Sequence, residues 1–98
     1  MAQIEVTKKD SETFEVKVTA AAVTTHTVKL RPEYHQKLTG GNVSPETLIQ
    51  ESFDFLLERE SNTAILPRFD LPTIGRYFPE YEKTIVARTR KSGRQIIA

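Results

Sequence analysis

The chain has 98 residues, of which 28% are charged and 38% hydrophobic, and its formal net charge is +1. This length suits one domain and is too short for two domains that each bury a core. The absence of cysteine excludes disulfides, zinc–thiolate sites and thiol catalysis, and it agrees with a reducing cytoplasm. Since no secretion signal opens the sequence and no apolar run approaches the roughly 20 residues of a membrane span, we expect a cytoplasmic protein without membrane contact.

The first thirty residues predict an antiparallel sheet. From Ile4 to Leu30, apolar residues alternate with Thr, Lys and Glu, which is the period of strands that are buried on one face. The charged stretch 8–12 predicts the first turn. The alternation of apolar and polar residues is interrupted between Ala20 and Val23, and either a second turn or a bulge in one continuous strand explains the interruption. We favour the turn, which gives a meander of about three strands.

Helices are expected in the middle of the chain. Pro32 suits the first turn of a short helix over 32–38, which two following glycines end. Ser44 is a good N-cap and Pro45 a good first residue for a second helix, which we expect to run to about Glu60. Its broad apolar stripe consists of Leu48, Ile49, Ser52, Phe53, Leu56 and Leu57.

A third helix is expected after Asp70, which can cap it. The apolar repeat from Leu71 to Phe78 places Tyr77 on the buried face of this helix. Residues 80–86 fit either a last helical turn or a strand. The sequence therefore predicts an α+β fold, with one domain over residues 1–86 in which two or three helices pack on one face of the antiparallel meander. The residues expected in its core include Leu48, Phe53, Leu56, Leu57, Ile74 and Phe78.

Charge is unevenly distributed along the chain. Residues 1–84 carry ten Lys/Arg and thirteen Asp/Glu, whereas residues 85–98 carry four basic residues and no acidic one. A mildly acidic body with a basic end is not typical of a dedicated nucleic-acid-binding domain. We expect residues 87–98 to form a basic, flexible tail that aids solubility, and phosphate binding is the alternative role. The basic residues of this tail are Arg88, Arg90, Lys91 and Arg94.

No pattern in the sequence indicates catalysis, a cofactor or a metal. His26 and His35 lie on different predicted elements, which is not a metal-ligand spacing, and His26 shares the parity of the buried strand residues. The helix residues Glu51, Asp54 and Glu58 are interpreted as a solvated acidic face. The glycine pair lacks the surrounding residues of a phosphate-binding loop. We therefore expect no enzyme, with no catalytic residue, cofactor or metal site.

A strand-helix-helix pattern spans Thr25 to Glu60. It comprises Thr27-Val28-Lys29-Leu30, the helix from Pro32, the glycine turn and the helix that opens with Ser44-Pro45-Glu46. This pattern resembles a ribbon-helix-helix repressor. The resemblance implies a homodimer whose paired strands enter the major groove of DNA while the second helix holds a phosphate at its N-terminus. It also implies that Thr25, Thr27 and Lys29 contact bases and that Ser44 lies at the phosphate.

A second resemblance covers the helical half of the chain. The stretches Ser44-Pro45-Glu46, Phe53 to Glu60, Phe69-Asp70-Leu71 and Tyr77 to Glu82 resemble a group of short uncharacterised bacterial proteins. This resemblance implies a bacterial origin and no known activity. The sequence as a whole favours a small non-catalytic binding protein that acts by contact with a protein partner or with itself as a homodimer. The alternative is a ribbon-helix-helix-like, homodimeric DNA-binding regulator.

Overall fold

The computed structural model describes residues 2–94, with side chains described up to residue 90. Its sheet begins with three antiparallel strands, β1 (Gln3–Lys8), β2 (Thr13–Thr19) and β3 (Val23–Lys29). The expected meander is therefore confirmed, and a turn rather than a bulge separates β2 from β3. Facing pairs such as Val6 with Val16 keep the apolar side chains on one face, because residues opposite each other in an antiparallel pair share a face.

A short fourth strand, β4 (Arg68–Asp70), lies parallel to β3 and gives the sheet order β1-β2-β3-β4. The sequence did not predict this strand, because three residues are too few to display a period. A parallel neighbour requires a long crossover, which the helices between β3 and β4 supply. The N–H of Thr27 donates to the carbonyl of Pro67 at 2.8 Å and aligns the incoming segment with β3.

The helices follow the expected start signals. Helix α1 (Pro32–Thr39) ends at Gly40, whose φ of 64° is the left-handed conformation that glycine tolerates. Helix α2 (Pro45–Leu57) begins at Ser44, whose hydroxyl accepts the N–H of Thr47 at 3.1 Å. A 3-10 turn, η2 (Leu71–Thr73), leads into the one-turn helix α3 (Ile74–Tyr77), and α4 (Tyr81–Arg94) follows.

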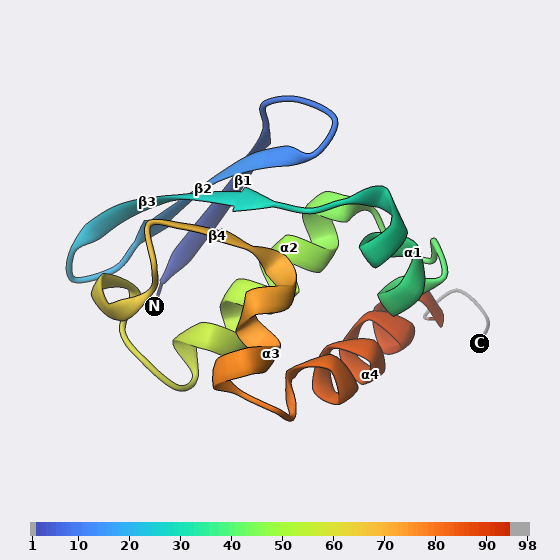
Figure 1. Cartoon of the computed structure of the whole chain (residues 1–98). Coiled ribbons are helices and arrows are strands. Elements are labelled where there is room, and N and C mark those ends of the chain that lie inside the picture. The colour runs from blue at the N-terminus through green and yellow to red at the C-terminus, as the bar shows by residue number, and fades with distance from the viewer. Residues whose placement is uncertain (1, 95–98) are drawn as a thin grey trace.

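The core lies between the sheet and the helices, which all cover the same face of the sheet (Figure 1). Val16, Val18 and Val28 of the strands are buried in the same cluster as Leu48 and Phe53 of α2. Of the six core residues expected from the helices, Leu48, Phe53, Leu56 and Ile74 are buried, and Leu57 and Phe78 pack against the core but are only partly buried. The placement of Leu48 and Phe53 confirms the expected inner face of α2.

The expectation for Tyr77 is wrong, because its side chain is 65% exposed. The predicted face assumed a continuous α-helix from Leu71. The segment instead begins as a 3-10 turn, which has about three residues per turn, and this shifts the direction of the side chains that follow. Tyr77 consequently points away from the core.

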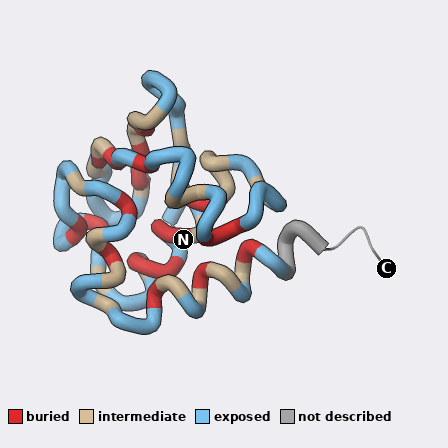
Figure 2. The backbone as a smooth tube through the Cα atoms, turned by 45° about the vertical axis from the view of Figure 1, so that its right-hand side comes forward, coloured by how far each residue is buried: buried red, intermediate tan, exposed pale blue. Residues whose placement is uncertain are grey.

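Residues 87–94, expected in a tail, belong to α4 in the structure. Tyr81, Ile85 and Thr89 repeat at every fourth position, on one side of α4, and are buried. Figure 2 shows buried and exposed segments alternating along this helix. The hydroxyl of Thr89 donates to the carbonyl of Ile85 at 2.9 Å, which satisfies this buried polar group. The expected boundary at residue 86 therefore falls within a helix.

We predict that Phe53→Ala lowers the free energy of unfolding by about 3–5 kcal/mol. The Phe53 ring is fully buried, and its centroid lies 5.4 Å from that of His26 and 6.0 Å from that of Phe69, so truncation leaves a cavity. Urea denaturation of both proteins measures the difference. Gln50→Ala, at an exposed position of the same helix, is the control, and equal stability of the two variants would contradict the assigned core.

Candidate functional site

An apolar cleft of about 160 Å³ opens between the end of α2, the segment before β4 and α3. We call it the α2–α3 cleft. Its walls come from the end of α2, the link that follows it, β4 and the segment from η2 to α3, so only the folded chain assembles it. The principal wall residues are Leu56, Ile65, Phe69, Ile74 and Phe78.

Two exposed apolar side chains stand at the mouth of this cleft. Leu66 is 43% exposed and Tyr77 is 65% exposed, and both belong to its lining. Large apolar side chains that gather around a depression are typical of interaction sites, whereas scattered ones are ordinary. Val23, the other large apolar residue with comparable exposure in residues 2–90, lies at the start of β3 and does not line the cleft.

Hydrogen bonds from two buried side chains, His26 and Asn62, hold the segment that forms one wall. His26 Nδ1 donates to the carbonyl of Leu66 at 2.8 Å, and its Nε2 lies 2.8 Å from the hydroxyl of Thr24. The amide of Asn62 donates to the carbonyl of Ala22 at 3.0 Å and to Thr24 Oγ1 at 2.9 Å. The chain from 62 to 66 is therefore tied to the sheet, and the interpretation of His26 as a core histidine is confirmed.

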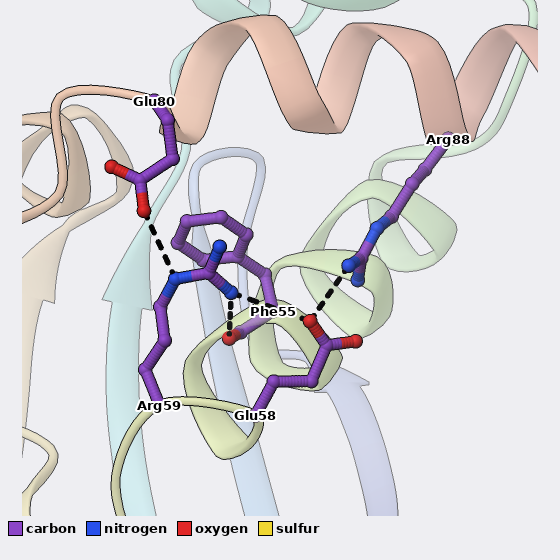
Figure 3. Close-up of polar contacts among 5 residues, drawn as sticks. All are labelled: Phe55, Glu58, Arg59, Glu80 and Arg88. Carbon is purple, nitrogen blue, oxygen red and sulfur yellow. Dashed lines mark hydrogen bonds and ion pairs between the residues drawn. The ribbon is translucent and has the colours of Figure 1, made fainter.

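An ion-pair network ties the end of α2 to α4 (Figure 3). Arg59 donates from Nε to Glu80 at 3.1 Å and from Nη1 to the carbonyl of Phe55 at 3.1 Å. Its guanidinium carbon lies 3.6 Å from the centroid of the Phe55 ring, which is cation–π geometry. Arg88 of α4 donates to Glu58 at 2.7 Å. These contacts fix the last turn of α2, from which Leu56 reaches the cleft.

Aromatic packing connects this ion-pair network to the cleft. The Phe55 ring meets Tyr81 with centroids 5.3 Å apart and Phe78 with centroids 5.9 Å apart, both edge to face. Phe55 lies outside the stripe predicted for α2, yet it is fully buried because α4 covers the opposite side of that helix. Since Phe78 is a wall residue, the position of this wall depends on the contact between α2 and α4.

The acidic face of α2 has carboxylates in contrasting environments. The hydrogen bond from Arg88 is the main reason why the pKa of Glu58 is lowered. Partial burial is the main reason why the pKa values of Glu51 and Asp54 are raised, and repulsion from neighbouring carboxylates adds to this effect. Arg88 acts in the opposite direction on both residues. Glu51 and Asp54 thus lie in the less solvated part of the acidic face.

The polar groups of the cleft do not form an acid–base pair. Its lining contains the carboxylate of Glu60 and the hydroxyl of Thr73 among otherwise apolar or aromatic residues. Both histidines donate or accept hydrogen bonds elsewhere, His26 as described above and His35 through Nε2 to the carbonyl of Val43 at 2.7 Å. In the described part of the chain, no three His, Cys, Asp or Glu side chains gather as metal ligands. The cleft offers shape and apolar surface.

Thr25, Thr27 and Lys29 lie on the outer face of β3, which the helices do not cover. β3 is flanked by β2 on one side and β4 on the other. Ser44 starts the helix that packs on the inner face, and its hydroxyl is occupied in capping that helix. The structure therefore does not bring Ser44 and the three strand residues onto one surface.

The basic residues near the end of the chain lie on different surfaces. Arg88 pairs with Glu58, whereas Arg90 lines a groove between α1 and α4 together with Lys37 and Lys83. The side chains of Lys91 and Arg94, two further candidate phosphate contacts, lie outside the described part of the structure. The candidate residues therefore do not form a single phosphate-binding patch within residues 2–90.

Comparison with models of known protein families, with curated proteins and with solved structures found no match to this chain. Within residues 2–94, no helix has the length and apolar character needed to cross a membrane. The α2–α3 cleft, which the sequence analysis missed, is the site that the geometry defines best. Its sequence signal is weak, because the apolar repeat placed Tyr77 on a buried helix face and Leu66 belongs to no periodic pattern.

We predict that Glu58→Gln makes the melting temperature less sensitive to acid. The folded-state pKa of Glu58 is lowered from 4.5, so the stability that this carboxylate contributes is complete above 4.5 and is lost as pH falls through the folded-state value. Melting curves between about pH 6 and about pH 3 measure this effect. Glu12→Gln is the control, since Glu12 forms no ion pair within residues 2–90. Equal acid sensitivity of wild type and Glu58→Gln would contradict the assigned ion pair.

Proposed function

We propose that this chain is a non-catalytic binding protein whose α2–α3 cleft receives a bulky apolar side chain from a protein partner. The observation that carries the proposal is the combination of an apolar cleft with exposed Leu66 and Tyr77 at its mouth. Tyrosine is enriched at protein interfaces because it presents a large, fairly rigid contact area with a hydroxyl that tolerates water. Binding would bury these two side chains.

The size of the cleft supports a protein side chain as the occupant. Pockets for drug-sized molecules and cofactors usually measure about 300–1,000 Å³ and contain several convergent polar groups. The volume here is about 160 Å³, and Glu60 supplies the charged group of the lining. A cleft of this size accommodates one large apolar side chain, with Leu66 and Tyr77 contacting the residues beside it.

The bonding around the cleft supports recognition without a large rearrangement. The wall at Leu66 is held by His26, and the wall at Phe78 is held through Phe55 and the Arg59 network. A pre-formed site loses less conformational entropy on binding than a site that must first become ordered. The smaller loss of conformational entropy matters in a small interface, where the free energy gained from buried apolar area is limited.

The DNA-binding alternative has weaker support. Thr25 and Lys29 are exposed on β3 and accessible from outside, but the ribbon arrangement requires two β3 strands to pair with each other. That pairing would displace β4, whose Phe69 is a wall of the cleft and packs against Phe53. A salt-sensitive mobility shift with duplex DNA that disappears in Thr25→Ala/Lys29→Ala would favour this alternative over the cleft.

The proposed function predicts the outcome of a peptide selection. Random peptides displayed on phage and selected on the wild-type protein should converge on sequences with one bulky apolar anchor. Leu66→Ser/Tyr77→Ser should weaken the selected synthetic peptides by at least about tenfold, because hot-spot side chains at a small interface carry most of the binding energy. Isothermal titration calorimetry measures these affinities.

Val23→Ser is the matched control for this experiment. It removes an apolar side chain of similar exposure, 59%, from a position outside the cleft, and it should leave the affinity unchanged. Peptides without a common apolar anchor, or equal weakening by Val23→Ser, would overturn the proposal. Circular dichroism of each variant establishes that the fold is retained.

A further inference from the structure

The sheet ends in two edges of very different length. β4 forms one edge and has only three residues, Arg68–Asp70. β1 forms the other edge and pairs with β2 without interruption from Gln3 to Lys8. Within the described residues, no strand pairs with the outer side of β1. A regular strand without proline or a bulge presents unpaired N–H and C=O groups on which another strand can pair.

The side chains of β1 also remain incompletely covered. Ile4 and Val6 pack against the core but are only partly buried, whereas Val16 and Val18, their partners on β2, are fully buried. The apolar inner layer of the sheet therefore continues to the free edge. A neighbouring strand that carries apolar residues at the same height would complete the burial of Ile4 and Val6.

We propose that a second copy of this chain pairs antiparallel with β1, about a two-fold axis at Val6, so that the two sheets form one continuous sheet. This inference rests on the proposed function in so far as both require contact with protein, but it uses a surface separate from the α2–α3 cleft. The contact is isologous, since each copy contributes the same strand and the assembly closes as a dimer.

The position of the two-fold axis follows from the face of the sheet that opposite residues share and from the charge of Glu5. Opposite residues of an antiparallel pair share a face, so a symmetric pairing centres on a single residue of β1. Centring on Glu5 places the two Glu5 side chains opposite each other, which is unfavourable. Centring on Val6 pairs residues 4–8 of both copies, with Val6 opposite Val6 and Glu5 opposite Thr7. Centring on Ile4 or Thr7 pairs fewer residues of the strand.

The same register places a cation of the second copy beside the acidic face of α2. Lys8 is opposite Phe14 on β2 and therefore belongs to the helix-covered face of the sheet. In the paired dimer, Lys8 of the second copy lies opposite Ile4 on that face. An open hollow of about 750 Å³ begins at Ala2, two residues before Ile4, and its lining includes Glu51 and Asp54 of α2.

The charge of this hollow supports the arrangement. Its lining contains the carboxylates of Glu51, Asp54 and Glu58, and its one cation in the described structure, Arg88, is hydrogen-bonded to Glu58. Partial burial raises the pKa values of Glu51 and Asp54, and the charge of Arg88 offsets this effect only in part, so a second positive charge beside them is favourable. Lys8 of the second copy supplies that charge, and the two-fold axis repeats the contact on the other side.

Disulfide formation between single-cysteine variants tests the register directly, because the natural chain has no cysteine. Opposite Cβ atoms lie about 4.5–5.5 Å apart in such a pair, which is close enough for a disulfide after a small adjustment. An oxidised mixture of Glu5→Cys and Thr7→Cys proteins should give the mixed dimer in preference to either symmetric one. Symmetric Glu5→Cys or Thr7→Cys dimers in preference to the mixed one would overturn the axis at Val6.

Sedimentation equilibrium of proteins without an introduced cysteine tests the contact itself. The wild type should sediment as a reversible dimer, and Lys8→Glu should raise the dissociation constant at least about tenfold, because it places a carboxylate beside Glu51 and Asp54 in both halves. Lys83→Glu, an exposed position on α4, makes the same charge change and should leave dimerisation unaltered. A wild type that stays monomeric at millimolar concentration, or equal effects of both variants, would overturn the proposal.

Peptide binding separates this inference from the proposed function. Lys8→Glu should bind the selected peptides with wild-type affinity, since Lys8 does not line the cleft. A dimer that binds no peptide would overturn the cleft proposal and leave the β1 contact supported. A monomer that binds peptide would overturn the β1 contact and leave the cleft proposal supported.

Discussion

The packing of α2 between the sheet and α4 is the constraint on which the rest of the structure depends. Phe53 points from α2 toward His26 and Phe69, whereas Phe55, two residues later, packs against Tyr81 and Phe78. Residues two apart on a helix lie on different faces, so α2 needs an apolar neighbour on each side. The strands supply one neighbour, and the return of the chain from β4 to α4 supplies the other.

Buried polar groups determine how the connecting segments lie against these layers. His26 donates to the carbonyl of Leu66, and Asn62 donates to the carbonyl of Ala22 and to Thr24 Oγ1, all across long sequence separations. The hydroxyls of Ser52 and Tyr81 lie 2.7 Å apart between α2 and α4. No buried side-chain nitrogen or oxygen within residues 2–90 lacks a hydrogen-bond partner. An unpaired buried polar group costs about 1–3 kcal/mol, so these bonds favour one arrangement of the link that forms the cleft.

The two proposed contact surfaces use different parts of this architecture. The α2–α3 cleft is formed where the last turn of α2 meets the link and α3, and its walls are held from both layers. The second surface consists of the free edge of β1 and the acidic outer face of α2. A dimer through β1 leaves Leu66 and Tyr77 accessible, so each copy would present its own cleft to a partner.

Local sequence signals determined much of the fold. The alternation from Ile4 to Leu30 defines the meander, and Ser44-Pro45 defines the start of α2, because both signals act between residues close in the chain. Tertiary contacts decided the rest. β4 exists because β3 offers it an edge, and Phe55 is buried because α4 returns over it. The cleft joins Leu56, Phe69 and Phe78 across links that no local period describes, so only the folded chain could place Leu66 and Tyr77 at its mouth.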